Sequence, residues 1–202
     1  MCNARLALAR SWIATACILG ATSTAALSGR VNAAEISAVA VSNEAATYHI
    51  SFDAVADAPA QLVFEQLSDY AHLDRLSSVI TSITVEPSPD GKSERVRSIL
   101  RACLFLFCKE IVQVEDVTEP DRQSIVAVVV PGLGDFTSGN CEWHIENAGA
   151  RTRIHYEATR TIAFWIPPII GSWVIKHTMR EQFESSVAAL ERMANKASGL
   201  QR

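Results

Sequence analysis

Beyond residue 47, polar and apolar residues alternate along most of this chain, and this period of two predicts β-strands. Residues 48–52 have the pattern of a half-buried strand. Six later segments read in the same way, namely 80–86, 94–102, 109–118, 124–130, 137–146 and 152–162. The connections between them are short and rich in Pro, Gly, Asp and Asn. Such connections predict hairpins and therefore an antiparallel sheet of about seven strands.

The apolar spacing changes to a helical period in two regions. After the first strand, Asp57-Ala58-Pro59 supplies an N-cap and an early proline, which predicts two short helices over residues 60–76. At the other end of the chain, residues 169–197 predict one long helix. Its apolar stripe consists of Met179, Phe183, Val187, Leu190 and Ala194. A lone helix can bury this stripe only against the sheet, so we predict an α+β fold in which a curved sheet wraps around the C-terminal helix.

This order of elements resembles the START-like superfamily of helix-grip proteins, which includes polyketide cyclases, coenzyme-Q-binding proteins and lipid carriers. Residues 60–76 are similar to the first-helix region of that superfamily. There an apolar helix leads into an Asp-aromatic pair, Asp69-Tyr70 here, followed by spaced apolar positions, Leu73 and Leu76. Many members have a proline next, where this chain has Ser77. The resemblance covers residues 46–197, and residues 164–168 resemble an exported subgroup.

The first 33 residues have the layout of a secretory signal. They contain no acidic residue, and Arg5 and Arg10 precede a weakly apolar run over residues 12–27. Val31 and Ala33 satisfy the small-x-small rule for cleavage by signal peptidase. The alternatives are a membrane anchor, for which the run is shorter than roughly 20 residues, and a lipoprotein signal at Cys17. We therefore expect a cleaved signal over residues 1–33 and a secreted, periplasmic protein. We expect residues 34–45 to form a short lead, 46–197 one domain and 198–202 a tail.

Composition and charge exclude some classes of binding partner. Removal of residues 1–33 takes away three arginines and changes the formal charge from −4 to −7. An acidic chain disfavours nucleic acid as a partner. The histidines show no zinc-type spacing with cysteines or carboxylates, so we predict no metal site and no cofactor.

The two ends of the predicted sheet differ in polarity, because successive turns of a meander alternate between its ends. One end collects the polar turns 88–91, 119–122 and 147–149. The other collects the apolar segments 104–107, 131–136 and 164–170. Loops normally carry polar residues, so we interpret the apolar end as the mouth of a cavity. Its predicted residues are Leu104, Phe105, Leu106, Phe107, Leu133, Phe136, Phe164, Trp165 and Trp173.

Three interpretations of the apolar end stay open. The loops fold inward as a plug, or they rim a hydrophobic cavity and make transient contact with a membrane, or they bind another protein. Trp165 and Trp173 suit an interface with one dry and one wet side. Each loop carries apolar residues that would be unfavourable in water.

Three cysteines lie beyond the predicted signal. Cys103 and Cys108 bracket the first apolar loop. In one straight strand their Cα atoms would lie about 16–17 Å apart, whereas a disulfide needs less than about 7 Å. If the loop turns, the two residues face each other, and we predict a disulfide. The alternative is two unpaired buried thiols. Cys141 falls within a strand pattern and is expected to be a buried thiol.

Alternation also assigns the faces of the last two strands. The inner face is predicted to carry Cys141, Trp143 and Ile145 on one strand, and Ile154, Tyr156, Ala158, Arg160 and Ile162 on the next. The outer face then carries Glu142, His144, His155 and Glu157. A buried Arg160 needs a partner, either an acid such as Asp135 or Glu115, or a polar group of a ligand. The predicted ligand-binding residues are Tyr156, Arg160, Trp143, Ile154, Phe183 and Met179.

These patterns favour a non-catalytic protein that binds, and transports or sequesters, a hydrophobic ligand such as a lipid, an isoprenoid quinone, a sterol-like or hopanoid-like molecule, or a polyketide. The alternative is an aromatase/cyclase-like enzyme that uses Arg160, Tyr156 and His155. It requires a histidine or carboxylate inside the cavity with a perturbed pKa. A third interpretation is an envelope protein whose apolar end binds another protein.

Overall fold

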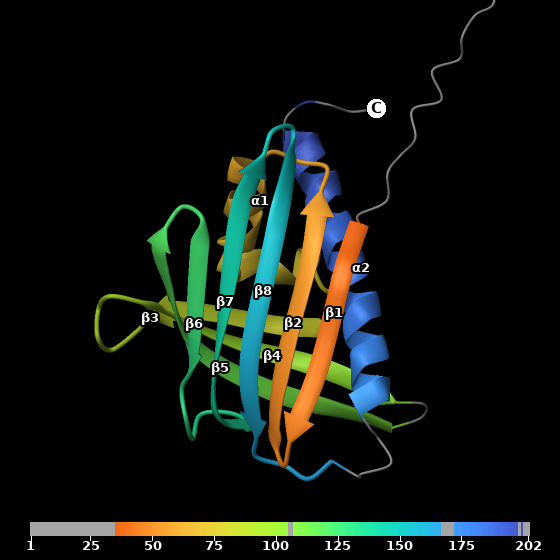
Figure 1. Ribbon diagram of the computed structural model, residues 1–202. Coiled ribbons are helices and arrows are strands. Elements are labelled where there is room, and N and C mark those ends of the chain that lie inside the picture. The colour runs from red at the N-terminus through yellow and green to blue at the C-terminus, as the bar shows by residue number, and fades with distance from the viewer. Residues whose placement is uncertain (1–34, 105–106, 167–171, 198, 200–202) are drawn as a thin grey trace, which may run out of the picture. The chain divides into compact units, whose positions relative to one another are not determined.

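The computed structural model describes residues 35–104, 107–166, 172–197 and 199 (Figure 1). In this part of the chain, eight antiparallel strands form a curved sheet in the order β1-β2-β8-β7-β6-β5-β4-β3, with β1 and β3 as its two edges. The strands are β1 (Glu35–Glu44), β2 (Thr47–Ala56), β3 (Ile80–Pro87), β4 (Glu94–Leu104), β5 (Phe107–Asp121), β6 (Ser124–Val129), β7 (Phe136–Ala148) and β8 (Arg151–Ile162). The predicted α+β fold is confirmed, with one strand more than expected.

The additional strand is β1, which occupies the region predicted to be a short lead. It pairs antiparallel with β2 along its whole length, with an irregularity between Ile36 and Ala38. Val39 is buried in the core, and Ile36 and Val41 pack against it. The apolar residues of this segment are interspersed with Ser and Ala, so their periodicity was too weak to predict a strand. The backbone of β2 provides the hydrogen-bonding partner that specifies β1.

Three helical elements follow the predicted order. Helix α1 (Ala60–Leu67) has Pro59 at its N-cap position and buries Val63, Phe64 and Leu67. The second short helix is a 3₁₀ segment, η1 (Tyr70–Arg75). The long helix α2 (Ser172–Ala197) contacts β1, β2 and α1. The predicted helix start at residue 169 lies outside the described residues. No helix of the described part is long and apolar enough to cross a membrane.

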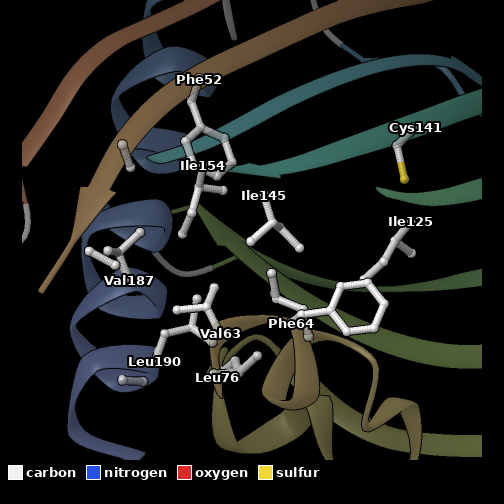
Figure 2. Close-up of a cluster of buried hydrophobic side chains, with 14 of the residues drawn as sticks. Phe52, Val63, Phe64, Leu76, Ile125, Cys141, Ile145, Ile154, Val187 and Leu190 are labelled. Atoms are coloured by element: carbon white, nitrogen blue, oxygen red, sulfur yellow. The ribbon is translucent and has the colours of Figure 1, made fainter. Parts of the chain in front are cut away.

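The apolar stripe of α2 forms one side of the hydrophobic core (Figure 2). Val187, Leu190 and Ala194 are fully or almost fully buried, and Phe183 packs against the same cluster. Phe52, Ile145 and Ile154 supply the sheet side of this core, and Val63 comes from α1. One buried hydrogen bond lies beside this core: Thr152 Oγ1 donates to the carbonyl oxygen of Ala58 at 2.6 Å. The core thus joins the sheet, α1 and the C-terminal half of α2.

Candidate functional site

Four aromatic side chains line the inner face of the sheet. Phe52 of β2 stacks on Phe183 of α2, with ring centroids 4.0 Å apart, and meets Trp143 of β7 and Tyr156 of β8 at 5.7 and 5.3 Å. Trp143 and Tyr156 lie 4.5 Å apart. Phe52 is fully buried, whereas Trp143, Tyr156 and Phe183 are only partly buried. These three rings therefore leave some aromatic surface accessible on the inner face of the sheet.

Beside the aromatic residues, the inner face holds a buried ion pair. Arg160 of β8 donates from Nη2 to Glu115 Oε1 of β5, and the two side chains are only 8% and 11% exposed. The second carboxylate oxygen of Glu115 accepts from Gln113 Nε2 at 2.6 Å. Arg160 Nη1 donates to the carbonyl oxygen of Thr159 at 3.1 Å. Of the two acids that the sequence offered as partners, Glu115 is therefore the one that pairs with Arg160.

The path of the Arg160 side chain depends on a glycine. Strands β5 and β8 are not neighbours in the sheet, because β6 and β7 lie between them. Arg160 pairs with Gly139 on β7, and a Cβ atom at residue 139 would lie 3.1 Å from Arg160 Cδ and 2.4 Å from the carbonyl oxygen of Thr159. Gly139 also has a φ of +153°, which side-chain-bearing residues rarely adopt. The missing side chain leaves the space through which Arg160 reaches Glu115.

Burial sets the protonation of the neighbouring groups. It raises the pKa of the Tyr156 phenol well above its ordinary value, and it raises the pKa of the Cys141 thiol to about 11. Both groups are therefore neutral near neutral pH, so Tyr156 can donate a hydrogen bond and Cys141 is a poor nucleophile. Burial by itself would lower the pKa of Arg160, but the Glu115 carboxylate, together with smaller contributions from Cys141 and Tyr156, outweighs it, and the pKa is raised. Arg160 is therefore a permanent cation in this site.

The histidines predicted on the outer face do face outward. His155 Nδ1 lies 2.6 Å from Asp53 Oδ1, and this hydrogen bond raises the pKa of His155. His144 Nε2 lies 3.1 Å from Glu142 Oε1, and the two imidazole rings stack at 6.3 Å. Among the described residues, no three His, Cys, Asp or Glu side chains are grouped so that they could hold a metal ion.

A disulfide joins the two strands of the hairpin at the apolar end of the sheet. Cys103 and Cys108 face each other across the β4–β5 hairpin and are bonded, with their Cα atoms 4.0 Å apart. The predicted disulfide is thus present, and Cys141 is the buried free thiol that was expected among the described cysteines. Phe105 and Leu106 lie outside the described residues, as do the side chains of Leu104, Phe107 and Trp173.

Described residues in or next to the predicted apolar segments contact one another at this end. Lys109 Nζ, next to the disulfide, lies 4.4 Å above the ring of Phe164 and 3.8 Å from Asp135 Oδ1. The backbone N–H of Ala163 donates to the carbonyl oxygen of Asp135 at 2.8 Å. Asp135 also accepts from the backbone N–H of Val112 at 2.8 Å, which joins its loop to β5.

Within this end, the predicted mouth residues differ in exposure. Trp165 is 76% exposed and Leu133 is 46% exposed, whereas Phe136 and Phe164 are partly buried. The described part of the end therefore presents Trp165 and Leu133 to solvent and keeps the two phenylalanines closer to the protein.

A pocket of about 460 Å³ lies at the opposite, polar end of the sheet. Gln61, Phe64 and Glu65 of α1 line one side, and Glu119 and Arg122 line the other. Next to it, Tyr70 donates its hydroxyl to Glu119 at 2.7 Å. Ala60, Phe64 and Ile145 give the pocket an apolar part, and Glu65, Glu119 and Arg122 add charges of both signs. The polarity of the loops did not indicate this pocket.

The structure brings together most of the ligand-binding residues that were predicted from alternation. Trp143, Tyr156, Arg160 and Phe183 lie around one region, with Ile154 fully buried beneath it and Met179 partly buried on α2. Phe52 and Gln113 were missed, although both occupy the inward positions of their strands. Extending the period of two to β2 and β5 would have found them.

Comparison with known proteins identifies the fold family. A profile of the family described as polyketide cyclase/dehydrase and lipid transport matches residues 47–197. No curated protein matches the sequence.

Similar solved structures include the protein TTHA0849 from Thermus thermophilus (TM-score 0.61, 20% identity, 74% of this chain and 99% of that chain covered). A START superfamily protein from Mycobacterium smegmatis has a TM-score of 0.57 at 18% identity, and 74% of this chain and 98% of that chain are covered. The Zhui aromatase/cyclase from Streptomyces sp. R1128 has a TM-score of 0.56 at 14% identity, with 75% and 96% covered. At these identities the likeness concerns the fold alone.

Proposed function

Because this chain belongs to the polyketide cyclase/dehydrase and lipid transport family, we propose that it binds a hydrophobic ligand between the sheet and α2 and carries or sequesters it. The observation that carries this proposal is the partly exposed aromatic surface of Trp143, Tyr156 and Phe183 on the inner face. Ligand sites for apolar molecules combine such surface with a few polar groups that orient the ligand. Tyr156 and Arg160 supply those polar groups, and no cofactor is needed.

The direct test is extraction of purified protein with organic solvent, followed by mass spectrometry. We expect a hydrophobic molecule in the extract, and we expect the emptied protein to take up a fluorescent lipid. Quenching of Trp143 would report binding on the inner face, so the Trp143→Phe variant should lose the signal. The Trp165→Phe variant is the control, because its exposed ring lies at the end of the sheet. Repeated isolation without ligand, combined with no uptake, would contradict the proposal.

We propose that the ligand passes through the apolar end and that this end touches a membrane transiently. Its exposed Trp165 and Leu133 support this route. Vesicles of phosphatidylethanolamine and phosphatidylglycerol should accelerate loading of the emptied protein, and Trp165→Ala should slow it. Val128→Ala is a matched control, since Val128 is 50% exposed but lies within β6. Equal effects of the two variants would refute a special role for this end.

We further propose that the protein is exported to the periplasm after cleavage behind residue 33. The disulfide between Cys103 and Cys108 supports an oxidising compartment, because thiols are kept reduced in the cytosol. Mass spectrometry of the protein isolated from its own cells should find a chain beginning at Ala34. An intact N-terminus in the cytosolic fraction would contradict export.

An aromatase/cyclase-like activity is the second candidate. Glu115 places a carboxylate on the inner face next to Tyr156 and Arg160. Against it, both carboxylate oxygens are engaged, by Arg160 and by Gln113, and His155 points outward to Asp53. Chemical conversion of a bound aromatic polyketide precursor by the wild type, lost in Glu115→Gln, would favour the enzyme over the carrier.

A further inference from the structure

The polar part of the proposed ligand site has no net charge. Arg160 and Glu115 neutralise each other, and the carboxylate is further engaged by Gln113. The guanidinium has five N–H donors; among them, Nη2 donates to Glu115 and Nη1 to the carbonyl oxygen of Thr159, and the Cys141 thiol is a further hydrogen-bonding partner of the guanidinium. Tyr156 adds a neutral hydroxyl beside them. This part of the site therefore offers hydrogen-bond donors without offering an uncompensated positive charge.

Such a site treats charged and uncharged ligands differently. A carboxylate or phosphate brought next to Arg160 would also lie close to the Glu115 carboxylate, and like charges at short range repel. The anion would lose its hydration shell without gaining a cation of its own, which is strongly unfavourable in a buried place. A carbonyl or hydroxyl group can accept or share a hydrogen bond there while the ion pair stays intact.

The walls of the site favour rings over flexible chains. The accessible rings are those of Trp143, Tyr156 and Phe183, and the centroid of Tyr156 lies 4.5 Å from that of Trp143 and 5.7 Å from that of Phe183. The fully buried Phe52 packs against all three. A planar or ring-bearing ligand can stack on such surfaces and gains more than a linear chain of similar area.

We propose that the site selects an uncharged, ring-bearing ligand with a carbonyl or hydroxyl group, and that Glu115 excludes carboxylate and phosphate ligands by neutralising Arg160. This inference rests on the proposed hydrophobic binding and names its ligand class. Free fatty acids and phospholipids held by their head groups are thereby disfavoured, and ring ketones, quinones and sterol-like alcohols are favoured.

The test uses three probes of similar size that carry their substituent on the same ring carbon. Acetylnaphthalene has a neutral carbonyl, naphthoate has a negative charge, and ethylnaphthalene has no polar group. Their dissociation constants are measured near neutral pH by quenching of tryptophan fluorescence and by calorimetry. For the wild type we expect acetylnaphthalene to bind at least about tenfold more tightly than naphthoate, because only the anion must be desolvated beside Glu115.

Glu115→Gln removes the compensating charge and should strengthen naphthoate binding by about tenfold or more, which cancels most or all of the preference for acetylnaphthalene. Glu110→Gln is the matched control, because Glu110 lies on the same strand but is exposed on its outer face. If Glu115→Gln does not fold, the double variant Glu115→Leu/Arg160→Met removes both charges. It should reduce the preference for acetylnaphthalene over ethylnaphthalene, because of Arg160, Glu115 and Tyr156 only Tyr156 then remains as a donor.

Two results would overturn the inference while leaving the carrier proposal intact. One is wild-type binding of naphthoate as tight as that of acetylnaphthalene. The other is an unchanged preference for acetylnaphthalene over naphthoate in Glu115→Gln or, where the double variant is used, an unchanged preference for acetylnaphthalene over ethylnaphthalene. Failure of the folded wild type to bind any of the three probes, together with an empty organic extract, would overturn the proposed function itself and this inference with it.

Discussion

Replacing Arg160 by methionine should destabilise the fold strongly, because it leaves the buried Glu115 carboxylate without its cationic partner. The Glu115 side chain is only 11% exposed, so water cannot take the place of the guanidinium. After the substitution, its remaining hydrogen bond in the described structure is the one from Gln113 at 2.6 Å. Breaking a buried ion pair from one side typically costs about 3–5 kcal/mol. For a domain of this size, such a loss corresponds to a decrease in Tm of roughly 10 °C.

The assay is equilibrium unfolding in guanidinium chloride, with thermal unfolding as a second measurement. Arg153→Met is the control on the same strand, since Arg153 and its partner Glu146 are each 61% exposed. An exposed ion pair contributes about 0–1 kcal/mol, so this variant should unfold almost as the wild type does. The double variant Glu115→Leu/Arg160→Met should recover most of the stability lost in Arg160→Met, because apolar replacement of a whole buried pair is often neutral.

If Arg160→Met lowered the free energy of unfolding by no more than Arg153→Met does, the stabilising role of the buried ion pair would be refuted. It would also be refuted if the double variant were less stable than the single one. Either result would mean that water solvates Glu115 in the folded protein. A solvated Glu115 would then not exclude anionic ligands either.

Other contacts in the structure lead to three more expected outcomes. Cys103→Ser/Cys108→Ser should lower the free energy of unfolding by about 2 kcal/mol, as expected for loss of a disulfide that closes a short loop. Unfolding of the wild type in the presence of a reductant is the comparison, and a double variant as stable as the oxidised wild type would contradict the expectation. The hydrogen bond that His155 Nδ1 donates to Asp53 raises the folded-state pKa of His155 above its ordinary value of 6.5. The stabilisation from this bond should therefore be complete at pH values below 6.5 and be lost as the pH rises through the raised pKa; an NMR titration of the imidazole checks this, and an identical His155 pKa in Asp53→Asn would refute it. Gly139→Ala should destabilise by about 1–3 kcal/mol, since the new Cβ would lie 2.4 Å from a carbonyl oxygen of β8. Chemical denaturation measures this loss, and Gly149→Ala, which has a φ of +80° but open space around its Cβ, shows the cost of backbone strain without the close contact; an equal loss in the two variants would contradict a role for the contact.

The strands and the inner faces of the last two of them were predictable from the sequence because their signal is local. Side chains of a strand alternate between two faces, so the period of two assigns Trp143 and Tyr156 to one side without knowledge of the strand's neighbours. The disulfide was predictable for a similar reason, since only a turn brings Cys103 and Cys108 within bonding distance. Strand β1 escaped prediction because its stability depends on pairing with β2 rather than on a pattern of its own.

The polar part of the site could be predicted only in outline. The sequence showed that a buried Arg160 must have a partner, but it allowed Asp135 as well as Glu115. In the structure, Asp135 joins its loop to β5 and lies near Lys109, whereas Glu115 reaches Arg160 across a sheet position that Gly139 leaves open. Nothing in the order of the residues indicates that a glycine on β7 clears this path.

Spacing along the chain was sufficient to set the order of the elements, the antiparallel sheet, the apolar stripe of α2 and the polarity of the two ends of the sheet. Each of these depends on residues a few positions apart, whose spacing sets which way they face. The pairing of Arg160 with Glu115, 45 positions away in the chain, and the contact of Phe52 with Phe183 across sheet and helix emerge only in the folded protein. The curvature of the sheet and the packing of α2 set those distances, and both are properties of the whole fold.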